Sequence, residues 1–300
     1  MPRSAANTGL RSEENRIQTS DVSRAVAAAT SIASGLDLPV EDAVLLHNSN
    51  KLALRLLPCD LLARVAHVGQ EVAQFEVELA QRLTEIEAPV GALEPRAEPR
   101  VYERDGFAIT LWTYYEPGAP PEGSPAEYAN ALVRVHAGMR KVEVTAPHFG
   151  DRVAEPQLPI DSPDRTPALP DADRELLSNT LRSLKQAIES RGAAEQLLHG
   201  EPHPGTVLST TSGFRFIDLE TCCRGPVEFD LAHVPEAVSE LYPDVDQYLL
   251  RECRVLVLAM VAAWRWDPGD ELPNGQRAGQ DLLDAIREGP PWPTLDTLMP

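Results

Sequence analysis

The first 70 residues contain three short apolar runs, at 43–46, 52–57 and 61–66, joined by the polar turns His-Asn-Ser-Asn and Pro-Cys-Asp. Runs of this length between turn-forming residues predict three consecutive antiparallel strands. Asn48 and Asn50 tolerate the left-handed backbone of a tight hairpin turn.

Helical patterns flank these strands, at 21–34 and at 70–83, and a further hairpin is expected from runs at 100–103 and 107–112. A proline- and glycine-rich cluster at 116–124 then breaks all periodicity, which is typical of a boundary between two parts of a protein. The early part of the chain is therefore expected to be a small, sheet-rich lobe.

The rest of the chain is expected to be mostly helical. Ser124 opens a helix with a capping box, and Asp171 is the expected N-cap of a long helix. The other expected elements are a loop at 147–170, a hairpin at 207–217 and helices at 235–241 and 246–266. We therefore expect an α+β fold with a disordered tail at 1–20, an N-terminal lobe at 21–116 and a helical lobe at 117–300.

The formal charge of −19 limits the partners that such a chain can bind. Nucleic acid is excluded as the main partner, because phosphate neutralisation requires a basic surface, and an anionic membrane is disfavoured for the same reason. Residues 151–300 hold 26 acidic and 13 basic residues. This second half therefore favours a cationic or metal-bridged ligand, with a merely solvated acidic surface as the alternative.

The compartment is expected to be the cytoplasm. The longest apolar run, at 255–264, is too short to cross a bilayer, and residues 1–20 have no signal-peptide pattern. Four cysteines, Cys59, Cys222, Cys223 and Cys253, form neither a CxxC pair nor a spaced framework. Free thiols in a reducing environment are the simplest interpretation.

The strongest chemical signal lies between residues 198 and 232. His199, Glu201 and His203 stand on an expected loop, and Asp218 and Glu220 follow at the end of the expected hairpin. Side chains two apart in an extended segment share one face, so the last two carboxylates should lie together. Paired carboxylate oxygens suit Mg²⁺, which leaves other coordination positions to phosphate and water.

This stretch resembles the aminoglycoside phosphotransferase and choline kinase branch of the protein-kinase-like fold. The resemblance rests on His-Gly-Glu-Pro-His at 199–203, Ile-Asp at 217–218 and Gly-Pro-Val-Glu-Phe-Asp-Leu-Ala at 225–232, and it spans roughly residues 40–265. It implies a two-lobed fold and an ATP- and Mg²⁺-dependent transfer of the γ-phosphate to a hydroxyl group of a small molecule. With the acidic second half, the expected acceptor is cationic, such as an aminoglycoside or an amino-alcohol.

The resemblance also implies roles for individual residues. Asp218 would bind the Mg²⁺ that bridges the ATP phosphates, and Glu201 would accept or orient the proton of the acceptor hydroxyl. Thr206 stands where the family has a metal-binding Asn, and Glu220 would compensate for its weaker oxygen. The structural residues are expected to be His199, His203 and Asp230.

On the nucleotide side, a protein kinase holds the α- and β-phosphates with a lysine of the third strand, paired to a helix glutamate. The chain has only three lysines, and none lies on that strand; Lys51 starts the second strand. Arg64 occupies the lysine position, and Glu76 is its expected partner, with Glu71 and Glu78 as alternatives. The expected hinge at 112–116 would contact adenine, which assigns Trp112 and Tyr114 to nucleotide binding.

Two other functions are compatible with the sequence. Glu201, Thr206 and Arg64 depart from the family pattern, so the chain could be a pseudokinase that binds a nucleotide or metabolite without turnover. A non-catalytic interaction protein is the second alternative, against which the complete 198–232 pattern counts. Zinc hydrolysis is disfavoured, because neither a Pro-Cys-x-x-Cys partner nor an H-E-x-x-H spacing is present.

Overall fold

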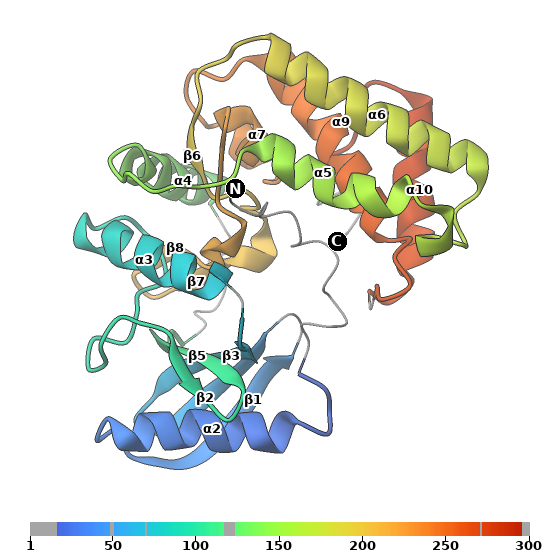
Figure 1. The fold of residues 1–300 in the computed structure, drawn as a ribbon. Coiled ribbons are helices and arrows are strands. Elements are labelled where there is room, and N and C mark those ends of the chain that lie inside the picture. Colours follow the sequence, from blue (N-terminus) through green and yellow to red (C-terminus); the bar gives the residue numbers. More distant parts are fainter. Residues whose placement is uncertain (1–16, 49–50, 70, 117–123, 271, 296–300) are drawn as a thin grey trace, which may run out of the picture.

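The computed structural model describes residues 17–48, 51–69, 71–116, 124–270 and 272–295. The chain forms two lobes, a sheet with one covering helix and a larger helical body, so the expected α+β fold is confirmed (Figure 1). Two hydrophobic cores correspond to these lobes, but their boundary does not follow the chain order.

The N-terminal lobe contains a five-stranded antiparallel sheet with the strand order β1-β2-β3-β5-β4. Alternation along β2 turns Leu52, Leu54 and Leu56 into the core under α2 and leaves the other face of the sheet toward the helical lobe. Helix α3 lies between the sheet and the helical lobe (Figure 1). The elements are α2 (Val22–Gly35), β1 (Val40–Asn48), β2 (Leu52–Pro58), β3 (Leu61–His67), α3 (Glu71–Glu85), β4 (Tyr102–Arg104) and β5 (Phe107–Thr113).

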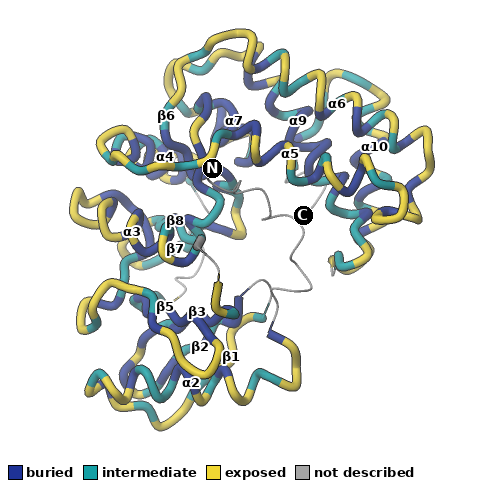
Figure 2. The backbone as a smooth tube through the Cα atoms, viewed as in Figure 1, coloured by how far each residue is buried: buried dark blue, intermediate teal, exposed yellow. Residues whose placement is uncertain are grey.

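The second lobe is built around α9, whose residues 255–260 are all buried among α5, α6, α7 and α10 (Figure 2). Its helices are α4 (Pro125–Met139), α5 (Phe149–Ile160), α6 (Asp171–Ser190), α7 (Val227–Leu231), α8 (Glu236–Ser239), α9 (Gln247–Trp264) and α10 (Gly275–Glu288), with the 3₁₀ turns η1 (Pro163–Arg165), η2 (Pro204–Thr206) and η3 (Leu219–Thr221). Two small antiparallel sheets lie among these helices. One pairs β6 (Gln196–Leu198) with β9 (Cys223–Gly225), and the other is the hairpin of β7 (Val207–Thr210) and β8 (Gly213–Phe216).

Most expected elements are present with ends shifted by a few residues, but the segment 147–170 is a correction. It was expected to be a loop, and it contains α5 and η1. Pro156 and Pro159 conceal the helix in the sequence, because proline removes a backbone donor and usually ends helical patterns. His148 and Asp151 form a reciprocal capping box at its start. A second correction is that Asp171 is the first residue of α6 rather than its N-cap.

The expected tail and linker fall mostly outside the described residues, namely at 1–16 and 117–123. Ile17, assigned to the tail from the sequence, is fully buried in the N-terminal core, and its carbonyl accepts a hydrogen bond from Asn48. Among the described residues, no helix is long and apolar enough to cross a membrane. The four cysteines are buried and unpaired.

Candidate active site

The loop after β6 is fixed by one buried carboxylate. Asp230 accepts hydrogen bonds from the backbone N–H groups of His199 and Gly200, each at 2.8 Å, and lies 2.9 Å from Nε2 of His136. Burial opposes its charge, but the hydrogen bond and charge interactions with His136 outweigh burial and lower the pKa of Asp230. The residue therefore holds the loop in place.

The two loop histidines bond to backbone. His199 is fully buried, and its Nε2 lies 2.9 Å from the carbonyl of Ile217 in the loop that carries Asp218. Burial lowers the pKa of His199. His203 accepts the N–H of Gly205 through Nδ1 and so caps η2. Both positions are compatible with the structural roles expected of them.

Glu201 projects from this loop toward a residue that the sequence did not single out. Its carboxylate forms an ion pair with Arg152 of α5, and Arg152 also contacts Glu155 at 2.8 Å. The side chain of Arg152 is only 9% exposed. Burial raises the pKa of the Glu155 carboxyl despite the nearby arginine. Arg152 was missed because its segment was expected to be a loop.

Asp218 stands at the tip of the turn that follows β8. It has a left-handed backbone (φ 67°) and is the N-cap of η3, which directs the chain toward Glu220. Arg64 of β3 contacts Asp218 at 2.5 Å through Nη2 and Glu76 of α3 through Nη1. The expected pair Arg64–Glu76 is therefore present, and it extends across both lobes to the carboxylate expected to bind metal.

Lys51 is a second cation in this cluster. Its Nζ lies 2.9 Å from Glu76 and 2.5 Å from Glu220. The sequence placed this lysine at the start of the second strand and gave it no role in the site. Period-2 alternation was the missing signal, because Lys51 lies two residues before Ala53, which pairs with Arg64 in the sheet.

The pKa values of the two carboxylates near these cations, Asp218 and Glu220, are shifted in opposite directions. Burial would raise the pKa of Asp218, but Arg64 and Lys51 outweigh burial and hold it below its ordinary value. For Glu220, burial together with the charges of Asp218 and Glu76 outweighs Lys51 and raises the pKa. Such divergence between neighbouring acids is common where a protein carries out proton or cation chemistry.

Thr206 lies beside the loop but turns its hydroxyl inward. Its Oγ1 donates to the carbonyl of Glu201 at 2.6 Å and lies 3.0 Å from that of His203. The oxygen is therefore engaged within the loop, and the structure adds nothing to the metal role expected for it.

At the expected hinge, Trp112 is buried and donates its Nε1–H to Thr110 at 2.8 Å. The guanidinium of Arg55 lies 3.9 Å from the ring centre of Tyr114. Trp112 also belongs to the hydrophobic core of the helical lobe, whereas Tyr114 packs against Arg55 of the N-terminal sheet.

A magnesium ion would find two carboxylates in this arrangement, Asp218 and Glu220. No cluster of three or more His, Cys, Asp or Glu side chains suited to a metal occurs in the described part of the chain. Two carboxylates nevertheless fit Mg²⁺, which proteins often bind through one or two such groups together with substrate phosphates. The donor set therefore fits an ion that arrives with its nucleotide.

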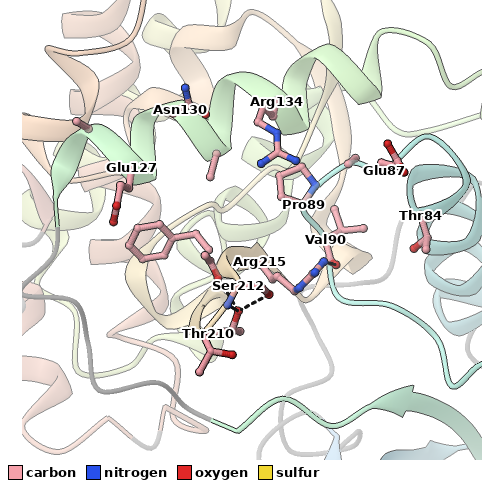
Figure 3. A pocket seen from close by; sticks show the side chains of 16 residues that line it. Thr84, Glu87, Pro89, Val90, Glu127, Asn130, Arg134, Thr210, Ser212 and Arg215 are labelled. Carbon is pink, nitrogen blue, oxygen red and sulfur yellow. Dashed lines mark hydrogen bonds between the residues drawn. The ribbon is translucent and has the colours of Figure 1, made fainter.

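A cavity of about 930 Å³ lies apart from these residues, between α3, α4 and the β7–β8 hairpin (Figure 3). Arg134, Arg215, Glu87 and Glu127 supply its charged groups, which cancel. None of the expected site residues lines it.

Comparison with known proteins identifies the family of this architecture. A model described as "Phosphotransferase enzyme family" matches residues 42–268. No curated protein gives a significant match.

Several solved structures share the fold over most of the chain. An amicoumacin kinase in complex with AMP-PNP and Ca²⁺ has a TM-score of 0.68 at 10% identity, covering 90% of this chain and 96% of that one. The GDP and kanamycin complex of APH(2")-IIia has a TM-score of 0.65 at 13% identity, covering 86% and 98%. A choline kinase from Streptococcus pneumoniae has a TM-score of 0.60 at 15% identity, covering 85% and 97%. At these identities the likeness establishes the kinase-like fold.

Proposed function

The chain belongs to the phosphotransferase enzyme family, and we propose that it transfers the γ-phosphate of ATP to a hydroxyl group of a small cationic molecule. One observation carries the proposal. Arg64 of the sheet joins Glu76 of α3 to Asp218 of the helical lobe, so the residues that we assign to phosphoryl transfer converge where the lobes meet. The neighbours solved with AMP-PNP and GDP support the use of a nucleotide.

Positioning and charge neutralisation supply most of the catalysis in phosphoryl transfer. Asp218 and Glu220 would hold Mg²⁺, which when bound neutralises charge on the transferring phosphate. Glu201 accepts a hydrogen bond from the acceptor hydroxyl and orients its oxygen, while Arg152 fixes the carboxylate. Asp230 keeps the loop at its place through the N–H groups of His199 and Gly200.

The two lobes divide the work. We assign residues 21–116 to the nucleotide and 117–300 to catalysis and the acceptor, with Trp112 and Tyr114 on the adenine side. The excess of acidic residues after position 150 supports a cationic acceptor. The amicoumacin, kanamycin and choline of the neighbours' names are small molecules of the type proposed. Four free cysteines support a reducing, cytoplasmic location.

The test is an acceptor screen. Purified protein with Mg²⁺ and either ATP or GTP is assayed for nucleoside diphosphate release against aminoglycosides, amino-alcohols and neutral sugars. Acceptor-dependent release that Asp218→Asn abolishes is the expected result. For a cationic acceptor, the apparent KM should rise with ionic strength, because salt screens its attraction to the acidic lobe. Turnover only with neutral sugars would contradict the cationic acceptor.

A pseudokinase is the second candidate, and two contacts favour it. The carboxylate of Glu201 is paired with Arg152 and not free for an acceptor hydroxyl. The hydroxyl of Thr206 is hydrogen-bonded within its own loop and is not free for a metal. Nucleotide binding without turnover on any acceptor would identify this function. No nucleotide binding by the wild-type protein would contradict both candidates.

A further inference from the structure

Two cations of the N-terminal lobe, Lys51 and Arg64, contact a group of three acids and share Glu76. Lys51 contacts Glu76 and Glu220, and Arg64 contacts Glu76 and Asp218. The side chain of Lys51 is only 8% exposed, a degree of burial that is rare for lysine unless it is paired. A kinase-like site needs one cation for the nucleotide phosphates, so the two residues here can have different tasks.

The sheet explains why both side chains point the same way. Leu52, Leu54 and Leu56 of β2 face the core under α2. The opposite face therefore carries Lys51 and Ala53, and Ala53 pairs directly with Arg64. Lys51 is thus a diagonal neighbour of Arg64 on the face turned toward the helical lobe.

Arg64 is held at both ends of its guanidinium. Nη1 bonds to Glu76 and Nη2 bonds to Asp218, and the group lies 6.0 Å from the ring of Trp112. A planar guanidinium between two carboxylates cannot turn toward a third anion without losing one of them. Its geometry suits a brace between α3 and the turn of Asp218.

The side chain of Lys51 can exchange its partners more easily than the guanidinium of Arg64. An ammonium group has three donors on a flexible stem, and two of them meet Glu76 and Glu220. Among the described residues the third donor of the ammonium group has no partner, and Glu220 belongs to the other lobe.

We propose that Lys51, the residue immediately before β2, binds the nucleotide phosphates, and that Arg64 is a positioning residue that holds Glu76 against Asp218. A phosphate oxygen takes the place of Glu220 at Nζ, and Glu220 is then free to face the metal. The inference rests on the proposed nucleotide-dependent function and changes the residue to which phosphate binding is assigned.

The scarcity of lysine allows a direct test on the wild-type protein. An ATP analogue with an acyl group on its γ-phosphate labels amines close to the phosphates. Nζ attacks the acyl carbon and an amide bond forms; the bond from that carbon to the phosphate oxygen breaks, ATP leaves with the electron pair, and the amine proton passes to solvent. Peptide mass spectrometry then compares Lys51, Lys141 and Lys185.

The expected result is label on Lys51 that excess AMP-PNP prevents. Label that AMP-PNP prevents at Lys141 or Lys185, or none on Lys51 from a protein that binds AMP-PNP, would overturn the inference. The experiment needs no variant, so the folding of a mutant does not affect it.

Calorimetric titration with AMP-PNP and Mg²⁺ provides the second measurement. Lys51→Met should weaken binding roughly 30-fold or more, because a buried charged hydrogen bond is lost, and Lys51→Arg should restore part of it. Arg64→Met should weaken binding less but lower kcat of basal ATP hydrolysis, with partial rescue by Arg64→Lys. The control is Lys185→Met on α6, whose amine lies 3.9 Å from Glu189.

The outcomes separate this inference from the proposed function. If Lys51→Met binds AMP-PNP as the wild type does, the assignment of Lys51 is wrong and the function stands. If the wild-type protein binds no nucleotide, both are wrong.

Discussion

At the residue scale, the loop conformation at Gly200 is possible only because glycine has no side chain. Its backbone has φ +94°, and a Cβ built there would lie 2.0 Å from the carbonyl oxygen of Thr221. Gly200→Ala should therefore lower the free energy of unfolding by more than the roughly 1–2 kcal/mol of a left-handed conformation, and it should displace the loop of Glu201. Thermal and urea unfolding measure the loss.

Gly213 is a matched control, because its φ is +102° and its Cβ position is open. Gly213→Ala should incur only the conformational cost. Equal losses for the two variants would show that the contact with Thr221 has no energetic importance.

The lowered pKa of Asp230 predicts how the stability of the protein depends on pH. Its folded pKa lies below the ordinary value of 3.8, so its stabilising effect is complete above that value and is lost as the pH falls through the folded pKa. Asp230→Asn places an amide against two backbone donors, and the variant should lose at least about 1.5–3 kcal/mol at neutral pH. The difference in Tm from the wild type should shrink below about pH 4. A difference that stays constant in acid would contradict this account.

At the element scale, α5 is the helix that brings Arg152 to the catalytic loop. Arg152→Met leaves the carboxylates of Glu201 and Glu155 without their cation. Removing one partner of a buried pair should cost roughly 3–5 kcal/mol at neutral pH. The pKa of Glu155 is already raised by burial, and losing the arginine raises it further, so the deficit should be larger at neutral than at mildly acidic pH.

Urea unfolding of Arg152→Met and of Arg182→Met provides the comparison. Arg182 of α6 is 62% exposed, and its replacement should change stability by no more than about 0.5 kcal/mol. Similar losses for both variants would mean that the pair with Glu201 contributes nothing.

Local patterns predicted the strands of the N-terminal sheet, the β7–β8 hairpin and most helices, because alternation and capping are encoded in neighbouring residues. Ser124 is the N-cap of α4, and its side chain accepts a hydrogen bond from the backbone N–H of Glu127. Helix α5 was missed because Pro156 and Pro159 indicate a loop, whereas the helix is stabilised by its capping box and by the burial of Phe149 and Val153. Tertiary packing decided what local propensity could not.

The site was predicted to a similar extent. Asp218, Glu76 and Arg64 were found because motif spacing and strand order bring them together, and they do meet. Lys51 was missed because the period-2 alternation that places it on the same face as Arg64 was not applied to it. Arg152 was missed with its helix, and its pair with Glu201 is a long-range contact that no local pattern encodes.

At the scale of the whole molecule, the two cores do not coincide with the two halves of the chain. Leu54 of β2 lies in the core under α2, whereas Leu79 and Leu83 of α3 belong to the core of the helical lobe. The backbone of Val90 also forms a parallel bridge with Phe216 of β8. The boundary predicted at residue 116 therefore divides the chain in sequence only, because α3 precedes it and packs in the core of the second lobe. Glu76 can reach both cations and approach Asp218 because its helix lies on that border.

Hydrogen exchange can show whether local stability follows the boundary at residue 116 or the boundary between the two cores. The test compares variants of two leucines from the same half of the chain. Leu54 and Leu79 are both fully buried, and each change to alanine should cost roughly 2–5 kcal/mol. Leu54→Ala should reduce amide protection in α2, β2 and β3. Leu79→Ala should instead reduce it in α4 and β8, as should Leu256→Ala of α9, because local stability follows the core to which a residue belongs. If Leu79→Ala lowered protection in the sheet as Leu54→Ala does, α3 would unfold with the N-terminal lobe, and the brace between Glu76 and Asp218 would join two independently stable units.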